Sequence, residues 1–281
     1  GIGRRQRQMC IRDRPEVETT RRGIEPYLIG RKFIDCNTRN TNLRIRFNKN
    51  LLNNIYGSEI IKVMRVAKYL KVILNNNYSL VFHLGMTGFL RIAKHFTIQK
   101  HDHLIFKTDD NTNLIFNDSR RFGLCKIIKP SEKFKLLENN GPDPFQEIAT
   151  GDYLYKIIKN RTANIKAVLL NNKIISGIGN IYACEILWDT RINPRRKAKR
   201  LSKKQCTKII KSAKEILTRA INSGGTTLKD YFNADLQSGY FKIELKAYDR
   251  EGEGCKRCSG KIKRIVQANR STFFCSKCQT K

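Results

Sequence analysis

Four cysteines near the carboxyl end of the 281-residue chain have the spacing of a metal site. They form two pairs, Cys255 with Cys258 and Cys275 with Cys278, with two residues inside each pair and 16 residues between the pairs. Two intervening residues let one tight turn present both sulfurs to a single tetrahedral ion. A redox dithiol would need a βαβ context, which the surrounding sequence lacks. Because four thiolates leave no open position, we predict one structural Zn²⁺ that folds a hairpin and does no chemistry.

The other five cysteines do not suggest a disulfide framework. The total of nine is odd, and no secretory signal is visible in the sequence. We therefore expect the remaining five to be small buried apolar residues. They are Cys10, Cys36, Cys125, Cys184 and Cys206.

A second chemical signal is the net charge of +32, from 56 Lys and Arg against 24 Asp and Glu. An excess of this size favours a polyanionic partner, because each phosphate that a cation neutralises releases counterions. No apolar run approaches the roughly 18 residues that a membrane span needs. The composition therefore predicts a nucleic-acid partner rather than a membrane, and a bacterial cytoplasmic location.

The elements that position these residues change in character along the chain. A helix is expected over 15–30, since Pro15 suits a first turn and Gly30 suits an end. Strand-like runs follow, separated by short turns, which suggests a β-sandwich or barrel. The expected strands are 43–47, 69–74, 78–84, 103–107, 113–117 and 124–128.

After a linker at Gly141-Pro142-Asp143-Pro144 the periodicity becomes helical. It continues over 152–221, with breaks at 176–179 and 193–194, and a loop-rich stretch leads from Gly224 to the cysteine pairs. The sequence therefore predicts a β-rich half, a helical half and a metal-bound hairpin.

Several segments, in order, resemble the formamidopyrimidine-DNA glycosylase family. Any one of them is weak evidence, but the ordered set is specific and extends from Pro15 to Gln279. The Val-Glu-Thr-Thr-Arg-Arg-Gly opening and the Arg-Arg-Phe-Gly segment are similar to the purine-directed branch rather than to the paralogous endonuclease VIII enzymes. Besides the zinc hairpin, the segments are Pro15–Gly23, Ala67–Leu70, His83–Gly88, Lys100–His103, Asp118–Gly123, Gly177–Ala183 and Gly224–Asp230.

The resemblance implies an α+β fold with three parts. These are an N-terminal β-sandwich over 15–142, a helix–two-turn–helix domain over 150–240 and a zinc finger over 245–281, with DNA held between the domains. It further implies a monomer that acts on double-stranded DNA containing oxidised purines or abasic sites. The reaction would release 8-oxoguanine or formamidopyrimidines and nick the strand by β,δ-elimination.

Extracting a base leaves a hole in the stack that side chains must fill. By resemblance, Met86, Arg120 and Phe122 are these fillers, although Met86 and Phe122 alone would pass as ordinary core residues. The Gly-Ile-Gly-Asn turn that ends at Asn180 would grip a phosphate, or it could simply cap a helix.

Further roles are implied by the same resemblance. Lys68 corresponds to a lysine associated with phosphate contact and elimination, although alone it would pass as a surface lysine, and Arg270 to an arginine that clamps phosphates. Glu16 and Glu185 are similar to pocket carboxylates, although either could instead cap or pair locally. The remaining implied DNA contacts are His101, Arg161 (whose place Thr162 could take instead) and Lys229, the last within a mobile loop over 224–248.

The amino-terminal residues depart from the family pattern. The family nucleophile is an N-terminal proline followed by a glutamate, and these places fall on Arg12 and Asp13. A guanidinium stays protonated and Pro15 is an internal amide, so neither can act as the nucleophile. We expect residues 1–14 to be a foreign leader. The alternative to a foreign leader is a natural divergent member that binds damaged DNA without turnover. For the substrate, the alternative to oxidised purines is a pyrimidine-directed enzyme like endonuclease VIII.

Overall fold

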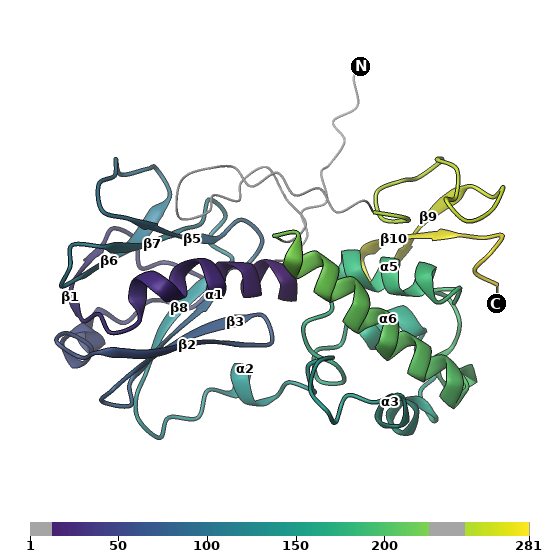
Figure 1. Ribbon diagram of the computed structural model, residues 1–281, viewed down its shortest axis with the longest axis horizontal. Coiled ribbons are helices and arrows are strands. Elements are labelled where there is room, and N and C mark those ends of the chain that lie inside the picture. Colours follow the sequence, from purple (N-terminus) through teal and green to yellow (C-terminus); the bar gives the residue numbers. More distant parts are fainter. Residues whose placement is uncertain (1–12, 225–244, 281) are drawn as a thin grey trace, which may run out of the picture. The chain divides into compact units, whose positions relative to one another are not determined.

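The computed structural model describes residues 13–224 and 245–280, which form two compact units. The N-terminal unit contains residues 13–139, and the C-terminal unit contains residues 140–219 and 245–280, while 220–224 group with the first unit. Each unit is described by itself (Figure 1).

The N-terminal unit is built from two four-stranded antiparallel sheets. One sheet has the order β1-β6-β7-β5 and the other β2-β3-β4-β8. Their bounds are β1 Phe33–Thr38, β2 Ile60–Val66, β3 Tyr69–Leu74, β4 Ser79–His83, β5 Phe89–Ala93, β6 Asp102–Thr108, β7 Asn113–Asn117 and β8 Leu124–Ile128. Besides α1, two short helical segments complete the unit, a 3-10 turn at Lys49–Asn54 and α2 at Lys135–Glu138.

The core lies between the two sheets, as in a β-sandwich. Phe82 of β4 and Phe106 of β6 come from different sheets, and their ring centroids are 6.0 Å apart in an edge-on arrangement. Helix α1 (Arg14–Leu28) contacts β2, β3 and β5, so it covers an edge strand of each sheet. By covering β2 and β5, α1 shields backbone groups of these edge strands that could otherwise pair with another chain.

Three strands that the sequence did not predict, β1, β2 and β5, belong to these sheets. The register of β1 shifts between Phe33 and Asp35, and that of β2 between Ile60 and Lys62. A bulge of this kind breaks the alternation of apolar and polar residues, which is the signal that sequence reading depends on.

The predicted strand at 43–47 is wrong. Leu43 and Phe47 are buried, as the alternation suggested, but both donate their backbone N–H to the carbonyl of Thr41, at 2.9 and 3.0 Å. The segment therefore folds around Thr41 as a turn and forms no ladder. Alternating burial alone does not require a strand.

The C-terminal unit is helical and carries a two-stranded hairpin (Figure 1). Helix α5 is buried on every side from Asn180 to Trp188, as expected for a helix at the centre of a helical unit. Two turns over 170–179 separate α4 from α5. The elements are α3 Gly151–Ile158, α4 Ile165–Leu169, α5 Asn180–Asp189, a 3-10 turn at Ala198–Arg200, α6 Lys203–Asn222, β9 Ile262–Gln267 and β10 Arg270–Cys275.

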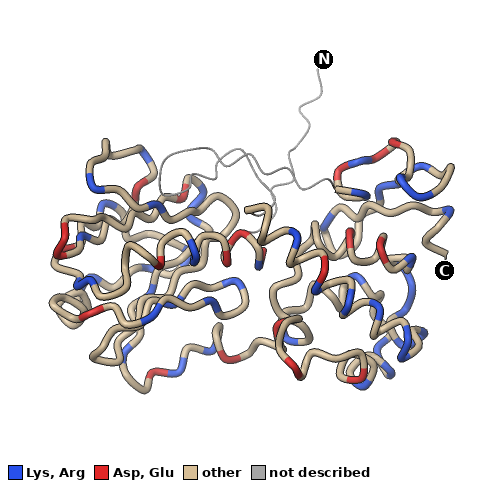
Figure 2. The backbone as a smooth tube through the Cα atoms, in the orientation of Figure 1, with Lys and Arg blue, Asp and Glu red and all other residues tan. Residues whose placement is uncertain are grey.

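The hairpin shares a hydrophobic cluster with the helices. Ile181, Cys184 and Trp188 of α5 pack with Tyr248 and Phe273, whose ring centroids are 4.9 Å apart. Lys and Arg occur along both units (Figure 2). Among the described residues, no helix is long and apolar enough to cross a membrane.

Candidate functional site

Two loops of the N-terminal unit lie against each other and carry the three predicted void-filling side chains. We call residues 84–88 and 118–123 the paired loops. Met86 belongs to the first loop, which links β4 to β5, while Arg120 and Phe122 belong to the second, which links β7 to β8. The backbones are close enough that a Cβ on Gly85, whose φ is +62°, would lie 2.6 Å from the amide nitrogen of Gly123. Glycine at Gly85 is therefore required both by the contact and by the conformation.

The paired loops are joined through a buried carboxylate. Asp118 is fully buried, and its side chain accepts hydrogen bonds from the Thr87 hydroxyl and from two backbone amides of its own loop. The amide of Gly123 donates at 2.7 Å and that of Arg120 at 3.3 Å. The Arg120 amide is also 3.1 Å from the Thr87 hydroxyl, which makes Thr87 a second link between the loops.

Two histidines add one further contact to each of the paired loops. Nδ1 of His83 accepts the Gly85 amide at 3.1 Å, and Nε2 of His103 lies 2.7 Å from the Asp118 carbonyl oxygen. Burial, with smaller contributions from the positive charges of Arg44 and Lys68, lowers the pKa of His83 to about 4. His83 is therefore neutral near pH 7 and keeps its acceptor nitrogen.

The side chains at the loop tips are accessible. Phe122 is 47% exposed, Arg120 is exposed and Met86 is half-buried, so Phe122 is not a core residue. The Arg120 guanidinium lies over the Phe122 ring, 4.6 Å from its centroid. Arg121 between them has a φ of +57°, a conformation that costs a non-glycine residue about 1 kcal/mol. This conformation allows residues on either side of Arg121 to stack.

The Lys100-His101-Asp102-His103 segment is held by a buried ion pair. Arg91 Nη2 lies 2.5 Å from Asp102 Oδ2, and Asn117 donates to the other Asp102 oxygen at 2.8 Å. His101 is half-buried beside this pair, and its carbonyl accepts the Asp118 amide at 3.1 Å. The segment thus connects the predicted DNA contact His101 to the paired loops.

The start of α1 places a carboxylate against Lys68. Asp13 precedes the helix, and its Oδ1 is 3.0 Å from Lys68 Nζ, with both side chains buried. The Asp13 amide donates to Glu16 Oε2 at 3.0 Å, so Glu16 caps the helix. Sequence reading assigned Asp13 and Arg14 to the leader, whereas the structure includes both in the folded N-terminal unit.

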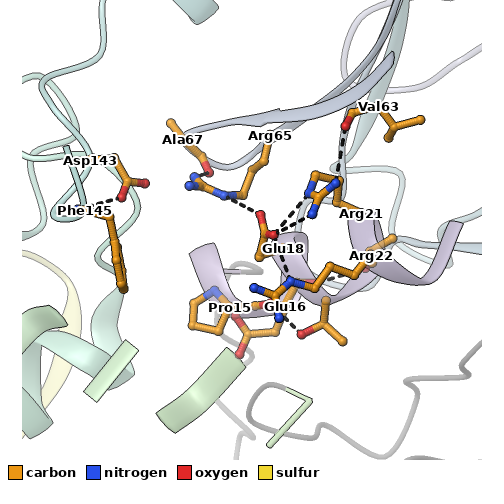
Figure 3. A network of polar contacts seen from close by, with 12 residues as sticks. Pro15, Glu16, Glu18, Arg21, Arg22, Val63, Arg65, Ala67, Asp143 and Phe145 are labelled. Atoms are coloured by element: carbon orange, nitrogen blue, oxygen red, sulfur yellow. Dashed lines mark hydrogen bonds and ion pairs between the residues drawn. The ribbon is translucent and has the colours of Figure 1, made fainter. Parts of the chain in front are cut away.

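A cluster of arginines surrounds Glu18 and reaches the turn before Lys68; Figure 3 shows the contacts around Glu18 and the bond from Arg65 to Ala67. Glu18 of α1 accepts from Arg21, Arg22 and Arg65, at 3.0 to 3.2 Å. Burial alone would raise the pKa of Glu18, but the hydrogen bonds from Arg21 and Arg22 and the charges of Arg21 and Arg65 lower it. Arg65 also donates to the Ala67 carbonyl at 2.7 Å, which fixes the β2–β3 turn immediately before Lys68.

The four cysteines converge in the C-terminal unit. Their sulfur atoms lie within 4.8 Å of one another, with Cys255 to Cys278 at 3.9 Å and Cys258 to Cys275 at 3.5 Å. Tetrahedral zinc with Zn–S bonds of about 2.3 Å requires sulfurs about 3.8 Å apart. The donor set therefore fits one Zn²⁺. Trp188 Nε1 donates to Cys255 Sγ at 3.4 Å and helps to orient this ligand.

The predicted clamp residue Arg270 lies just beyond the hairpin tip. The two tip residues, Ala268 and Asn269, have φ values of +48° and +57°, as a two-residue hairpin turn requires. The next residue, Ser271, is anchored to the helices, because its carbonyl accepts from Lys166 Nζ at 2.9 Å and from Asn180 Nδ2 at 3.0 Å. The hairpin therefore presents Arg270 from a fixed backbone.

Asn180 and Glu185 on α5 have anchoring contacts that the sequence did not indicate. Asn180 directs its amide nitrogen to the hairpin. The Glu185 carboxylate accepts the amides of Lys246, Ala247 and Tyr248, at 2.8 to 2.9 Å. Burial raises the pKa of Glu185, although these amides oppose the shift. Glu185 thus fixes the chain where it enters the zinc hairpin.

The remaining predicted residues are not brought into these clusters. Arg161 is exposed, and its Nε donates to the Ile157 carbonyl at 3.1 Å. Arg12 and Lys229 lie outside the described residues, as does most of the predicted mobile loop. Sequence reading missed Thr87, Asp118, Lys166 and Asp102 as organising residues. Thr87 and Asp118 belong to the family-like segments His83–Gly88 and Asp118–Gly123, and this was the sequence signal that could have found them.

The fold and site define a zinc-finger DNA-binding protein with a β-sandwich and a helix–two-turn–helix unit. The N-terminal domain of formamidopyrimidine-DNA glycosylase matches residues 13–125, its H2TH domain matches 140–231, and a zinc finger found in FPG and IleRS matches 252–281. The chain belongs to the formamidopyrimidine-DNA glycosylase family. This is a family of base-excision DNA glycosylases with AP lyase activity, so the predicted family, fold class and zinc are confirmed.

Individual relatives are similar over nearly the whole chain. A formamidopyrimidine-DNA glycosylase of Glaesserella parasuis is 41% identical over 94% of this chain and 97% of its own length. The Lactococcus lactis Fpg structure with abasic-site DNA is 31% identical, covers 96% of this chain and 100% of its own, and has a TM-score of 0.85. A MutM complex with DNA containing carbocyclic 8-oxo-G is 31% identical with the same coverage and a TM-score of 0.86.

Proposed function

We propose that the protein removes oxidised purines from double-stranded DNA and then nicks the strand, with the paired loops as the element that recognises the lesion. The observation that carries this proposal is the stacked Arg120 and exposed Phe122, on the loop that packs against the loop of Met86. A planar cation, an aromatic ring and a flexible thioether are suitable fillers for the hole that an extracted base leaves.

The DNA-bound relatives support the substrate class. The Lactococcus lactis relative is a complex with abasic-site DNA, and the MutM relative is a complex with DNA containing carbocyclic 8-oxo-G. Both ligands are DNA that contains a damaged site. We therefore assign 8-oxoguanine and formamidopyrimidine lesions, and abasic sites, as substrates of this chain.

The chemistry requires an amine that attacks C1′ of the sugar. The C–N bond forms at C1′ as the bond from C1′ to the base breaks, and the base leaves with its electron pair. The C1′–O4′ bond then opens, with its electron pair and a proton going to O4′, which leaves an iminium. The iminium makes the neighbouring protons acidic, and elimination of the flanking phosphates nicks the strand. By motif, the amine belongs at position 12. Lys68 is a weak candidate for this role, since an ammonium paired with the Asp13 carboxylate carries no lone pair. We assign Lys68, with Arg270, to phosphate contact and elimination.

Borohydride trapping tests the reaction on a duplex with 8-oxoguanine opposite cytosine. A variant that begins at residue 12 with R12P and D13E restores the family's proline and glutamate, and we expect it to form a covalent adduct and to nick the strand. The same variant with proline replaced by glycine is the matched control for the secondary amine. DNA binding without adduct or nicking in the restored variant would contradict the proposed reaction. Preferential release of thymine glycol would instead indicate pyrimidine specificity.

We also infer that the protein acts as a monomer at the cytoplasmic nucleoid. A single chain supplies both the paired loops and the zinc hairpin, and its substrate is the chromosome. Sedimentation of the free and DNA-bound protein tests the stoichiometry, and a two-to-one complex would contradict it.

A further inference from the structure

The side chains at the tips of the paired loops can best fill a gap in the DNA when contacts beneath them hold the loops in place. A filler that is already held when DNA arrives binds better, because ordering flexible side chains on binding costs free energy. A loop without side-chain contacts beneath its tip would not hold the filling side chains in one position. The contacts beneath the tips therefore matter as much as the tips.

We propose that Thr87 and Asp118 are positioning residues that lock the paired loops into one rigid unit for lesion recognition. This inference rests on the proposed function of the loops. Thr87 follows Met86 directly, and Asp118 is two residues before Arg120. The Thr87 hydroxyl donates to the Asp118 carboxylate and accepts the Arg120 amide at 3.1 Å, so one hydroxyl connects both loops.

The burial of the pair makes this link strong. Asp118 is fully buried and Thr87 is 9% exposed. A buried carboxylate is costly unless donors surround it, and here one hydroxyl and two amides do so. All three donors come from the paired loops. The carboxylate is therefore satisfied only when the two loops adopt the observed arrangement.

The loops have little freedom to reach another arrangement. The contact of Gly85 with Gly123 leaves no room for a side chain, and a Cβ on Gly123 would lie 2.6 Å from the His83 carbonyl oxygen. The Leu84 carbonyl closes the first loop by accepting the Gly88 amide at 2.8 Å. The left-handed Arg121 stores strain that the Asp118 hydrogen bonds on either side of it offset.

Substitution of Thr87 tests the proposal in the full-length chain. T87V has nearly the same shape but lacks the hydroxyl, and T87S restores it. We measure the affinity for a duplex with an abasic-site analogue, for the undamaged duplex, and the fluorescence of 2-aminopurine placed next to the analogue. We expect T87V to lower the ratio of damaged to undamaged affinity about tenfold. The 2-aminopurine fluorescence, which reports unstacking, should fall together with this ratio, while the affinity for the undamaged duplex should stay the same. T87S should recover both the ratio and the fluorescence.

T108V is a matched control in the same domain. The Thr108 hydroxyl is also buried, and it lies 2.7 Å from the Asp110 carboxylate and 2.8 Å from the Thr112 carbonyl oxygen. It lies at the end of β6 opposite to Asp102, about 20 Å along the strand. T108V therefore removes a similar bond without touching the paired loops. Its affinity ratio should equal that of the unaltered protein at matched thermal stability.

The outcomes separate the inference from the proposed function. Equal ratios and fluorescence for T87V and the unaltered protein would overturn the positioning role, and so would an equal loss in T108V. If T87V does not fold, D118N, which keeps the shape but removes one acceptor, takes its place with the same expected loss. An unaltered protein that does not prefer damaged DNA would instead overturn the proposed function, and the positioning role with it.

Discussion

The paired loops and the zinc hairpin present side chains in opposite ways. The paired loops are held from within, by a buried carboxylate and a hydroxyl that bond to the loop backbone. The zinc hairpin has a metal site at its base, and its strand β10 is fixed from outside by Lys166 and Asn180. Arg270, the first residue after the hairpin tip, thus depends on contacts that other elements make.

The difference follows from the size of each element. Loops that emerge from an eight-stranded sandwich inherit order from its ladders, so a few side-chain hydrogen bonds suffice. A two-stranded hairpin is marginal alone and needs a metal and a supporting surface. The comparison predicts that substitutions at the hairpin's anchors cause a large loss of stability that is confined to the hairpin. Substitutions in the paired loops should cause a smaller loss of stability and should alter lesion recognition.

The largest effect is expected from C255S. Structural zinc sites contribute roughly 10 kcal/mol or more, so removal of one thiolate should release the metal and unfold the hairpin. Zinc content and the affinity for undamaged duplex measure this. C206A changes a buried cysteine of α6 that lies outside the metal cluster, and it should retain one zinc. Full zinc content in C255S would contradict the site.

A smaller effect is expected from the titration of His83 beneath the first loop. Its pKa in the folded protein is about 4, below the ordinary value of 6.5, so the unfolded chain binds its proton first as the pH falls. The stability from neutral His83 is full above about pH 6.5 and is lost toward pH 4, by up to about 3 kcal/mol. H83N keeps an acceptor for the Gly85 amide but does not titrate. Urea unfolding at pH 7.5 and 4.5 should show a smaller loss for H83N, and equal losses would exclude this role.

K166M tests the outer support of the hairpin. Lys166 is fully buried and donates to the Ser271 carbonyl and to the Thr272 hydroxyl, at 2.9 and 2.6 Å. Methionine fills the space but donates nothing, which should cost about 1–3 kcal/mol. Hydrogen exchange of the β10 amides should accelerate while zinc stays bound. K173M, on an exposed part of the same unit, is the control. Unchanged exchange in K166M would show that the metal alone orders the hairpin.

F122A should have the smallest effect on stability and a clear effect on recognition. Phe122 is 47% exposed, so its loss should change the free energy of unfolding by no more than about 0.5 kcal/mol. The preference for damaged over undamaged duplex should nevertheless fall, because the ring no longer fills the gap. I148A removes another exposed apolar side chain and should leave the preference intact. A large loss of stability in F122A would mean that the Phe122 ring itself helps to hold the paired loops together.

The sequence by itself determined the features that depend on spacing along the chain. The two cysteine pairs predicted the zinc site, and β3, β7 and β8 have the bounds that alternation gave. The ordered motifs gave the family, which the matches along the chain confirm. These signals are local, because a turn, a strand or a motif is written in consecutive residues.

Only the tertiary structure decided which distant groups satisfy one another. Thr87 meets Asp118 across 31 positions, and Lys166 meets Ser271 across 105. The same reason explains why Glu185 holds the backbone at 246–248. A buried polar group takes its partner from whatever backbone the packed fold brings within about 3 Å, and no periodicity in the sequence records that choice.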